Sequence, residues 1–328
     1  MDLADVVKLI YDTLLFIGMS IAYIAEALVL SLIPKRLRGK SIVGEVALVT
    51  GAGGGLGRLI AIKLARLGAH VVVWDINETG NCSRLVSMET VRQIKEAGGK
   101  GWGYRCDLTC REDIYRTAKA VKIEVGAVTL LVNNAGYVCG KTLLELPDDE
   151  IDRTYQVNIL SHYATTKCFL ENMMKDNHGH IVTVASVAGL LGTYRCTDYS
   201  ATKFAAIGYH ESLFTELRSH GYDGIHATLV CPYFINTGMF EGVKPRLLPM
   251  LEPDYVAEEI VAGILTNQVN VVLPGSIRYL IPLKCFLPAK MCWALMYQIM
   301  QGPQSMMMFK GRESIQDQNA NITISKMD

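Results

Sequence analysis

The sequence predicts an α/β protein with a doubly wound parallel sheet in a single domain, preceded by an N-terminal membrane helix. From residue 45 onward, short runs of β-branched residues alternate with segments of helical periodicity, which is typical of repeated strand–helix units. The runs are apolar along their whole length, which indicates a sheet covered on both faces. Residues 13–34 form an apolar run close to the roughly 20 residues that span a bilayer core.

The alternation gives the expected order of elements. Strands are expected at residues 45–51, 69–77, 101–108, 128–136, 180–186, 225–232 and 269–274. Helices are expected at residues 56–68, 87–99, 111–126, 148–176 and 198–220. This order implies right-handed βαβ units, and therefore a sheet of the Rossmann type.

The composition argues against binding driven by overall charge. The 328 residues contain 32 Lys plus Arg and 32 Asp plus Glu, so no net field favours nucleic acid, and we expect none as a partner. The nine cysteines are an odd number without a CxxC pair, which fits a reducing compartment. No metal site is expected.

The apolar run at residues 13–34 is interpreted as an uncleaved anchor, because the residues before it are mainly acidic rather than basic. Glu26 and Lys8 point the same way and form a polar stripe on an otherwise apolar helix, which a helix lying in the membrane interface would use. A charge inside a spanning helix is costly, so both a spanning helix and an interfacial helix stay open. If it spans, the basic cluster that follows would hold the next domain in the cytosol. That cluster consists of Lys35, Arg36, Arg38 and Lys40.

A glycine-rich turn follows the first strand and reads TGAGGGLG, with Gly51, Gly55 and Gly57. Glycine lets a backbone approach a pyrophosphate closely, and the next helix offers free N–H groups, so the turn predicts a dinucleotide site. Asp75 ends the second strand, where a carboxylate accepts hydrogen bonds from ribose hydroxyls and repels a 2′-phosphate. We therefore predict NAD rather than NADP; the alternative is an aspartate that merely caps a turn.

A tyrosine followed four residues later by a lysine occurs four times, beginning at Tyr115, Tyr137, Tyr163 and Tyr199. Only Tyr199 and Lys203 come just after a core strand, which we expect to end at Ser186. In open α/β sheets, ligands bind outside the carboxyl ends of the strands, so this pair is the candidate active site.

The chemistry of this pair suits the transfer of a proton. An ammonium beside a phenol favours phenolate, so Tyr199 could accept the proton of a substrate hydroxyl with Lys203 lowering its pKa. Ser186 would hydrogen-bond the same substrate oxygen, and Lys203 would also hold ribose hydroxyls of the cofactor.

Together these features resemble the short-chain dehydrogenase/reductase family over about residues 45–275. The matching features are TGAGGGLG, Asp107 in CDLT, the NNAG segment with Asn134, Asn158, Ser186, Tyr199 with Lys203, and Pro232 with Thr237. The resemblance implies that Asp107 contacts adenine and that Asn134 belongs to a wall of the cofactor pocket. It also implies that Asn158 holds a proton-relay water and that Thr237 contacts the nicotinamide carboxamide.

Within that family the chain looks most like the membrane-bound retinol dehydrogenases and the lipid-droplet 17β-hydroxysteroid dehydrogenases. The shared stretches are LLVNNAGYV, HGHIVTVAS, YHESL and LVCPYFINTGMF. The long segment between Asp75 and Asp107 favours the retinol group.

The substrate end contains apolar, proline-bounded sequence. Residues 236–253 suit a lid over a hydrophobic alcohol, or simply pack onto the domain. We thus expect four parts: an anchor with its basic flank (1–40), an NAD-binding catalytic domain (41–275), a membrane-associated apolar and basic segment (276–312) and a disordered tail (313–328).

The expected function is oxidation of a lipophilic alcohol by NAD, with all-trans-retinol giving retinal. The alternatives are a 17β-hydroxysteroid or other lipophilic alcohol as the substrate, and a non-catalytic protein of the lipid-droplet surface. The expected location is the endoplasmic reticulum membrane, the lipid droplet or both, with the catalytic domain facing the cytosol. A homodimer is the expected assembly if the chain associates.

Overall fold

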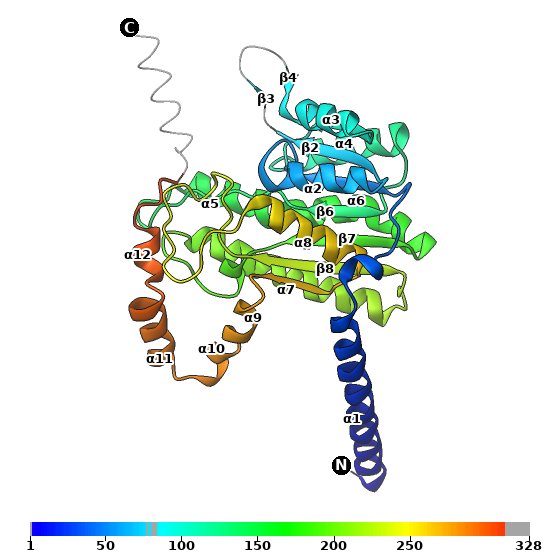
Figure 1. Ribbon diagram of the computed structural model, residues 1–328, viewed down its shortest axis with the longest axis vertical. Coiled ribbons are helices and arrows are strands. Elements are labelled where there is room, and N and C mark those ends of the chain that lie inside the picture. The colour runs from blue at the N-terminus through cyan, green and yellow to red at the C-terminus, as the bar shows by residue number, and fades with distance from the viewer. Residues whose placement is uncertain (1, 77, 80–83, 312–328) are drawn as a thin grey trace. The chain divides into compact units, whose positions relative to one another are not determined.

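The computed structural model describes residues 2–76, 78–79 and 84–311 (Figure 1). Two compact units form, Met1–Lys40 and Ser41–Asp328, and each is described by itself. The predicted boundaries after residue 275 stay predictions, and the expected tail at 313–328 lies outside the described residues.

The first unit consists mainly of helix α1 (Leu3–Leu32). Asp2 caps this helix: its carboxylate accepts from the Asp5 N–H at 2.8 Å, and the Asp5 carboxylate accepts from the Asp2 N–H. By length and composition, α1 is the one helix among the described residues that could cross a membrane, and its apolar stretch is unburied. A short 3-10 turn, η1 (Lys35–Leu37), follows.

The second unit is built on a seven-stranded sheet in the order β5-β2-β1-β6-β7-β8-β9. Its strands are β1 (Val46–Thr50), β2 (His70–Asp75), β5 (Lys100–Arg105), β6 (Leu130–Asn133), β7 (Gly179–Val184), β8 (Ile225–Pro232) and β9 (Asn270–Leu273). Every neighbouring pair in this sheet is parallel. The predicted doubly wound sheet is confirmed, and its order reverses between β1 and β6, where such folds bind ligands.

Helices cover both faces of the sheet. One face carries α2 (Gly55–Arg66), α3 (Val86–Glu96) and α8 (Pro253–Leu265); the other carries α4 (Arg111–Glu124), α6 (Ser161–Asp176) and α7 (Thr197–Ser219) (Figure 1). Alternation along β1 explains this: Val49 packs with Ile60 of α2, whereas Leu48 packs with Ile114 of α4 and Phe169 of α6. Because both faces of these strands are buried, their sequences are continuous runs of apolar residues.

Several elements differ from expectation. The helix expected at 148–176 is α5 (Asp148–Tyr155), a π turn η2 (Gln156–Leu160) and then α6. Strand β7 ends at Val184 rather than at residue 186, because the Ser186 hydroxyl accepts the Ala188 N–H and starts the 3-10 turn η3 (Val187–Gly189). Helix α8 and a short hairpin of β3 (Glu78–Thr79) and β4 (Arg84–Leu85) were not predicted.

The chain after β9 forms short helices. These are α9 (Ile277–Leu280), α10 (Leu283–Phe286), α11 (Ala289–Ala294), a π turn η4 (Leu295–Ile299) and α12 (Gly302–Met306). Aromatic side chains of the segment are exposed: Tyr279 at 75%, Phe286 at 82% and Trp293 at 57%. Farther on, Met306 and Phe309 are buried against the domain.

Candidate active site

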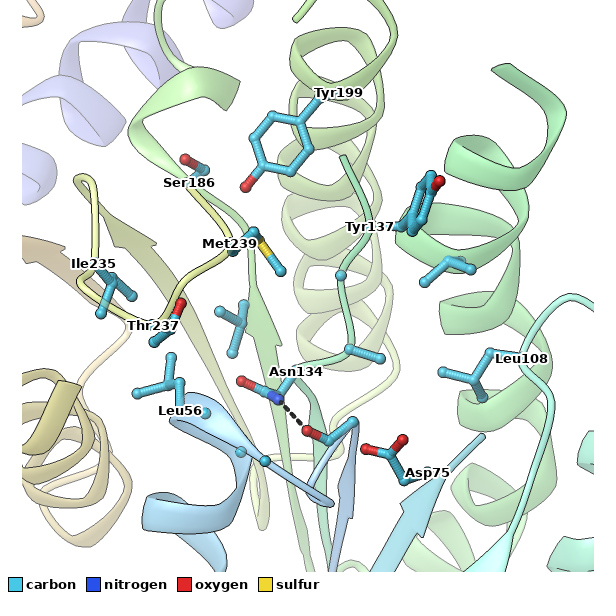
Figure 2. A pocket seen from close by; sticks show the side chains of 18 of the residues that line it. Leu56, Asp75, Leu108, Asn134, Tyr137, Ser186, Tyr199, Ile235, Thr237 and Met239 are labelled. Atoms are coloured by element: carbon cyan, nitrogen blue, oxygen red, sulfur yellow. Dashed lines mark hydrogen bonds between the residues drawn. The ribbon is translucent and has the colours of Figure 1, made fainter. Parts of the chain in front are cut away.

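A cavity of about 410 Å³ opens at the carboxyl ends of the central strands (Figure 2). It brings together side chains and backbone from every part of the predicted site except Asn158. The predicted residues on its lining are Gly51, Gly55, Gly57, Asp75, Asp107, Asn134, Ser186, Tyr199, Lys203 and Thr237. Asn158 lies just behind the wall: a Cβ placed on Gly136 would be 3.9 Å from its Oδ1.

The glycine turn needs glycine at two of its predicted positions for steric reasons. Gly51 has φ of +63°, and a Cβ there would lie 2.9 Å from the Cα of Ala135. A Cβ on Gly57 would lie 2.4 Å from the Gly51 carbonyl oxygen. The turn therefore packs tightly against its own helix and against the loop after β6.

The start of α2 suits an anionic group. Gly54 is its N-cap and provides no side-chain cap, so the N–H groups of the first turn keep their capacity to bind a ligand. A Cβ on Gly54 would meet no atom within 4 Å, so open space lies beside this helix end. A pyrophosphate fits both the space and the donors.

Asp75 ends β2 and lies at the edge of the same turn. Its carboxylate accepts the Gly53 N–H at 2.8 Å, so it fixes the turn and also lines the cavity. The capping interpretation and the ribose-binding interpretation are therefore compatible, because one carboxylate has room for several hydrogen bonds.

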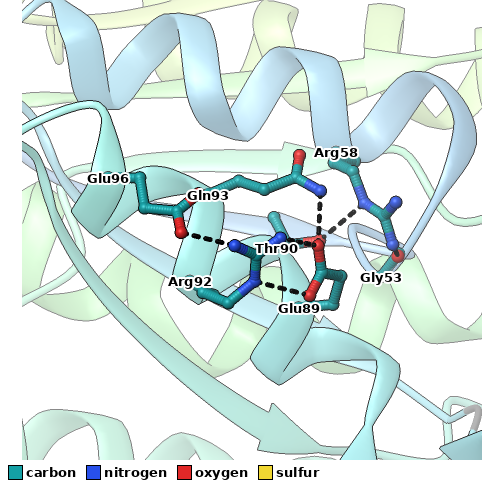
Figure 3. A network of polar contacts seen from close by, with 7 residues as sticks. All are labelled: Gly53, Arg58, Glu89, Thr90, Arg92, Gln93 and Glu96. Atoms are coloured by element: carbon teal, nitrogen blue, oxygen red, sulfur yellow. Dashed lines mark hydrogen bonds and ion pairs between the residues drawn. The ribbon is translucent and has the colours of Figure 1, made fainter.

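Arg58 is a residue of this region that the sequence reading missed. Its guanidinium donates to the Gly53 carbonyl and to the Thr90 hydroxyl at 3.0 Å (Figure 3). The Thr90 hydroxyl in turn donates to the Ala52 carbonyl at 2.7 Å. These bonds tie α3 to the glycine turn. No sequence signal indicated the bonds of Thr90, because its partners Arg58 and Ala52 are 32 and 38 positions away in the sequence.

Asp107 and Asn134 are held by local and cross-strand bonds. The Asp107 carboxylate accepts from the backbone N–H and the hydroxyl of Thr109, at 2.9 and 2.7 Å. The Asn134 amide donates to the Thr50 carbonyl at 2.9 Å, and this bond fixes the loop after β6 against β1. Both side chains are thereby oriented at the cavity edge.

Asn158 sits in the π turn η2 and is completely buried. Its Oδ1 accepts the Tyr137 N–H at 2.7 Å, and its Nδ2 donates to the Tyr137 carbonyl at 2.9 Å and to the Thr202 hydroxyl at 3.0 Å. The side chain therefore joins the loop after β6 to α7. π turns are frequent at functional sites because they re-aim one residue within a helix.

Ser186, Tyr199 and Lys203 meet on the far wall of the cavity. Tyr199 and Lys203 are nearly inaccessible, at 5% and 2% exposed. Burial raises the pKa of the Tyr199 phenol, and the nearby Ser186 hydroxyl opposes part of this rise. Burial lowers the pKa of Lys203 to about 8, and its Nζ donates to the Val184 carbonyl at 2.9 Å.

The other three tyrosines differ from Tyr199 in surroundings. Tyr115 and Tyr163 are 48% and 46% exposed and lie outside the cavity lining. Tyr137 does reach the lining (Figure 2), but its hydroxyl donates to the Glu150 carboxylate at 2.5 Å. Of the four tyrosines, Tyr199 is therefore the one that shares the cavity with Ser186 and a lysine four residues later.

The loop after β8 lines the cavity from beside the glycine turn to the apolar end. Thr237 lies beside that turn, since a Cβ on Gly55 would be 3.7 Å from the Thr237 Cβ. Farther along, Met239 and Phe240 continue the lining with apolar surface. One end of the cavity is thus a tight polar turn, and the other is apolar.

Comparison with known proteins agrees with this geometry. Residues 45–247 match the family model for short chain dehydrogenases. The chain belongs to the short-chain dehydrogenase family. The match includes the glycine turn, the Tyr199–Lys203 pair and the loop after β8, so the expected family is confirmed and the protein is a nicotinamide-dependent dehydrogenase.

Several relatives in this family are similar over most of their length. The chain is 48% identical to short-chain dehydrogenase/reductase family 16C member 6 of Bos taurus over 81% of this chain and 83% of the relative. It is 45% identical to epidermal retinol dehydrogenase 2 of Homo sapiens, covering 84% and 88%. It is 43% identical to estradiol 17-beta-dehydrogenase 11 of Pongo abelii, covering 86% and 92%.

Solved short-chain dehydrogenases share the fold. A Burkholderia phymatum enzyme in complex with NAD has a TM-score of 0.67 at 28% identity, covering 75% of this chain and 94% of that one. A metagenomic enzyme in complex with NADP has a TM-score of 0.60 at 30% identity, covering 71% and 98%. Both forms of the cofactor thus occur on this fold.

Proposed function

We propose that this short-chain dehydrogenase oxidises a membrane-dissolved lipophilic alcohol with NAD, and that all-trans-retinol is converted to retinal. The observation that carries the proposal is a single cavity with a pyrophosphate-binding turn and Asp75 at one end and Ser186, Tyr199 and Lys203 at the other.

The proposed catalytic roles follow from the geometry. Tyr199 accepts the proton of the substrate hydroxyl, and the Ser186 hydroxyl donates to the same oxygen as charge develops on it. Lys203 favours the phenolate, because a buried phenol ionises only beside positive charge. Asn158 positions the loop after β6 and, in this proposal, holds the water of a proton relay.

The proposed cofactor contacts use residues that already line the cavity. Gly51, Gly55 and Gly57 make room for the pyrophosphate, and Thr237, beside Gly55 on the lining, contacts the nicotinamide carboxamide in this proposal. Asp107 faces the adenine, Asn134 forms one wall, and Lys203 together with Tyr199 reaches the ribose hydroxyls. Bound there, NAD supplies the acceptor for the substrate's hydride.

NAD is preferred in this proposal because of Asp75. Its carboxylate lies on the lining beside Gly53, where it can accept from ribose hydroxyls and repels a 2′-phosphate. Arg58 is the cation closest in sequence to this turn, and it is engaged by Gly53 and Thr90.

A lipophilic substrate is supported by three features. Phe240 and Met239 make the substrate end apolar, α1 presents an unburied apolar surface, and relatives bear the names retinol dehydrogenase and estradiol 17-beta-dehydrogenase. The exposed aromatics after β9 also suit a membrane surface, where such side chains gather. The second candidate substrate is a 17β-hydroxysteroid, which the estradiol dehydrogenase relatives favour.

The proposed location is the endoplasmic reticulum membrane, the lipid droplet or both, with the catalytic domain facing the cytosol. A homodimer stays a prediction. Membranes containing the full chain should be incubated with NAD and a panel of retinol, estradiol and long-chain alcohols. Turnover of retinol above the other alcohols supports the proposal, and turnover of estradiol alone would replace retinol by the steroid.

Tyr199→Phe tests the catalytic assignment in the same membranes. Turnover should fall by at least roughly 100-fold, since the variant lacks the proton acceptor, while NAD binding persists. Tyr163→Phe is the matched control, because Tyr163 also lies four residues before a lysine but is 46% exposed. Full activity in Tyr199→Phe would contradict the proposal.

A further inference from the structure

The C-terminal end of the described chain packs against the substrate side of the active site. We name residues 302–311, which include α12, the C-terminal strap. Met306 is completely buried and Phe309 is 3% exposed, although both come more than a hundred residues after Tyr199. The two side chains belong to the same apolar cluster as Tyr199 and Phe240.

Three aromatic rings connect the strap to the catalytic tyrosine. The ring of Phe240 meets that of Tyr199 edge-on at a centroid distance of 5.8 Å. The centroid of the Phe309 ring lies 5.5 Å from the centroid of the Phe240 ring. Phe240 is therefore held between the catalytic residue and the strap.

Phe240 also separates two spaces. It lines the large cavity, and it lines a second cavity of about 50 Å³ that is bounded by Ser186, Tyr199 and Phe234. A space of this size holds only a few water-sized groups, since one water needs roughly 10–15 Å³ by this measure. A slender CH₂OH terminus fits beside Ser186 and Tyr199 more easily than a carbinol within a fused ring system.

Backbone bonds fasten the strap to the loop after β8. The Lys244 N–H donates to the Ser305 carbonyl at 2.9 Å, and the Lys310 N–H donates to the Glu241 carbonyl at 3.0 Å. Arg195 adds a bond from its guanidinium to the Phe309 carbonyl at 2.9 Å. Both backbone bonds lie just after Phe240 on the loop, at Glu241 and Lys244, so the strap restrains the segment that follows this ring.

Two glycines allow the strap to lie this close. Gly242 has φ of +88°, and a Cβ there would be 1.9 Å from the Met308 carbonyl oxygen. Gly140 has φ of +84°, and a Cβ there would be 2.3 Å from Cε1 of Phe309. Side chains at either position would push the strap away.

We propose that the C-terminal strap selects slender primary alcohols by holding Phe240 against Tyr199. Phe240 is the specificity-determining wall, and Phe309 is a positioning residue that acts through it. This inference rests on the proposed alcohol dehydrogenase function and narrows its substrate class. Without Phe309, the Phe240 ring can withdraw into the vacated space, and the small cavity widens.

The test compares a slender with a wide alcohol in full-length protein. The values of kcat/KM for retinol and for estradiol are measured for wild type, Phe309→Ala, Phe309→Leu and Met308→Ala. Phe309→Ala should raise the estradiol-to-retinol ratio by roughly tenfold or more, a change of the size expected for one altered pocket group. Phe309→Leu should restore most of the wild-type ratio. Met308→Ala is the matched control, because its side chain is 67% exposed.

Two outcomes would overturn the inference. Loss of both activities by the same factor in Phe309→Ala would show a merely structural role, and an unchanged ratio would show that the strap has no influence on selectivity. The Kd for NAD should stay unchanged, because the glycine turn is at the other end of the cavity. Gly242→Ala provides a second variant, in which the ratio should rise while Phe309 itself is retained.

A measurement without turnover separates this inference from the proposed function. Cys196 lines the small cavity and is completely buried, so its alkylation by N-ethylmaleimide reports opening of that space. The alkylation rate should rise severalfold in Phe309→Ala and stay unchanged in Met308→Ala. A wild type that oxidises no alcohol would refute the proposed function. An unchanged alkylation rate in Phe309→Ala would refute the proposal that the strap holds Phe240 against Tyr199.

Discussion

The ammonium nitrogen of Lys203 lies 5.5 Å from the centre of the Tyr199 ring, one helical turn further along α7. Both residues are inaccessible to solvent, so the charge of the lysine acts on the phenol through a medium of low polarity. The same burial lowers the pKa of Lys203 to about 8 and raises that of Tyr199. Burial therefore opposes the charged form of both side chains.

The first prediction concerns Lys203 and pH. Because the pKa of this lysine is about 8 in the folded chain and 10.5 ordinarily, the unfolded chain binds the extra proton between these values. The penalty for burying its charge is complete below pH 8 and disappears as pH rises to 10.5. Below pH 8, the free energy of unfolding of Lys203→Met should therefore exceed that of wild type by at most about 3 kcal/mol. Any packing contacts that the substitution loses reduce this gain.

The measurement is the free energy of unfolding of detergent-solubilised protein between pH 7 and 10.5. Burial also raises the pKa of thiols and phenols in this chain, so the difference between the two proteins matters rather than either curve alone. That difference should shrink as pH rises. A difference independent of pH would contradict the buried-charge explanation, and the loss of the bond to Val184 contributes only a constant offset.

The second prediction concerns the cofactor. Asp75→Asn should weaken NAD binding by roughly 10- to 100-fold, because hydrogen bonds to a charged acceptor are lost, and should reduce discrimination against NADP. The Kd values for both cofactors are the measurement. Asp107→Asn is the control, since Thr109 holds Asp107 at the proposed adenine end. The ratio of the Kd values for NADP and NAD should be the same in this variant as in wild type. Tighter binding of NADP than of NAD by the wild-type protein would contradict the proposed preference for NAD.

The third prediction concerns the glycine turn. Gly57→Ala should lower the free energy of unfolding by roughly 1–3 kcal/mol, because its Cβ would lie 2.4 Å from a backbone oxygen. Gly54→Ala is the matched control: its backbone is extended and no atom lies within 4 Å of the added methyl. Thermal unfolding without cofactor compares the two variants. Equal midpoints would contradict the packing of the turn described above.

The fourth prediction concerns Asn158. Asn158→Ala should cost roughly 2–4 kcal/mol, since both Tyr137 backbone groups and the Thr202 hydroxyl lose a buried partner. The dehydrogenase activity of Asn158→Ala should fall together with its stability. Thr215→Ala serves as the control, because the Thr215 hydroxyl bonds only its own helix at an exposed position. Chemical denaturation gives the comparison, and a stability equal to that of the control would count against the bridging role.

The fifth prediction concerns the membrane. Full-length protein should remain in the membrane pellet after both high-salt and alkaline-carbonate washes, because α1 offers an unburied apolar surface long enough to span. A variant without residues 1–40 should be extracted more easily. Release of the full-length protein by salt alone would indicate electrostatic attachment and contradict an apolar anchor.

Much of the fold was accessible from the sequence because its signals are local. Apolar runs, helical periodicity and the glycine turn each occupy a few consecutive residues, and the alternation of strands and helices along the chain follows from them. The order of the strands within the sheet came from the structure. Ser186, Tyr199 and Lys203 were found for the same reason, since each follows the end of a core strand at a readable distance. The sequence did not predict the π turn at Asn158, the early end of β7, helix α8 or the β3–β4 hairpin. The end of β7 is followed by a bond from the Ala188 N–H to the Ser186 hydroxyl, which leaves no periodic pattern in the sequence.

The sequence by itself determined the sheet, the candidate catalytic residues and the apolar anchor, because these depend on patterns within one segment. Tertiary structure decided that Arg58 braces the glycine turn, that the Tyr137 hydroxyl is bonded to Glu150, and that Phe309 backs Phe240. The bond from Arg195 to Phe309 joins residues 114 positions apart. Such contacts leave no periodic trace in the sequence, because they depend on how completed elements pack against each other.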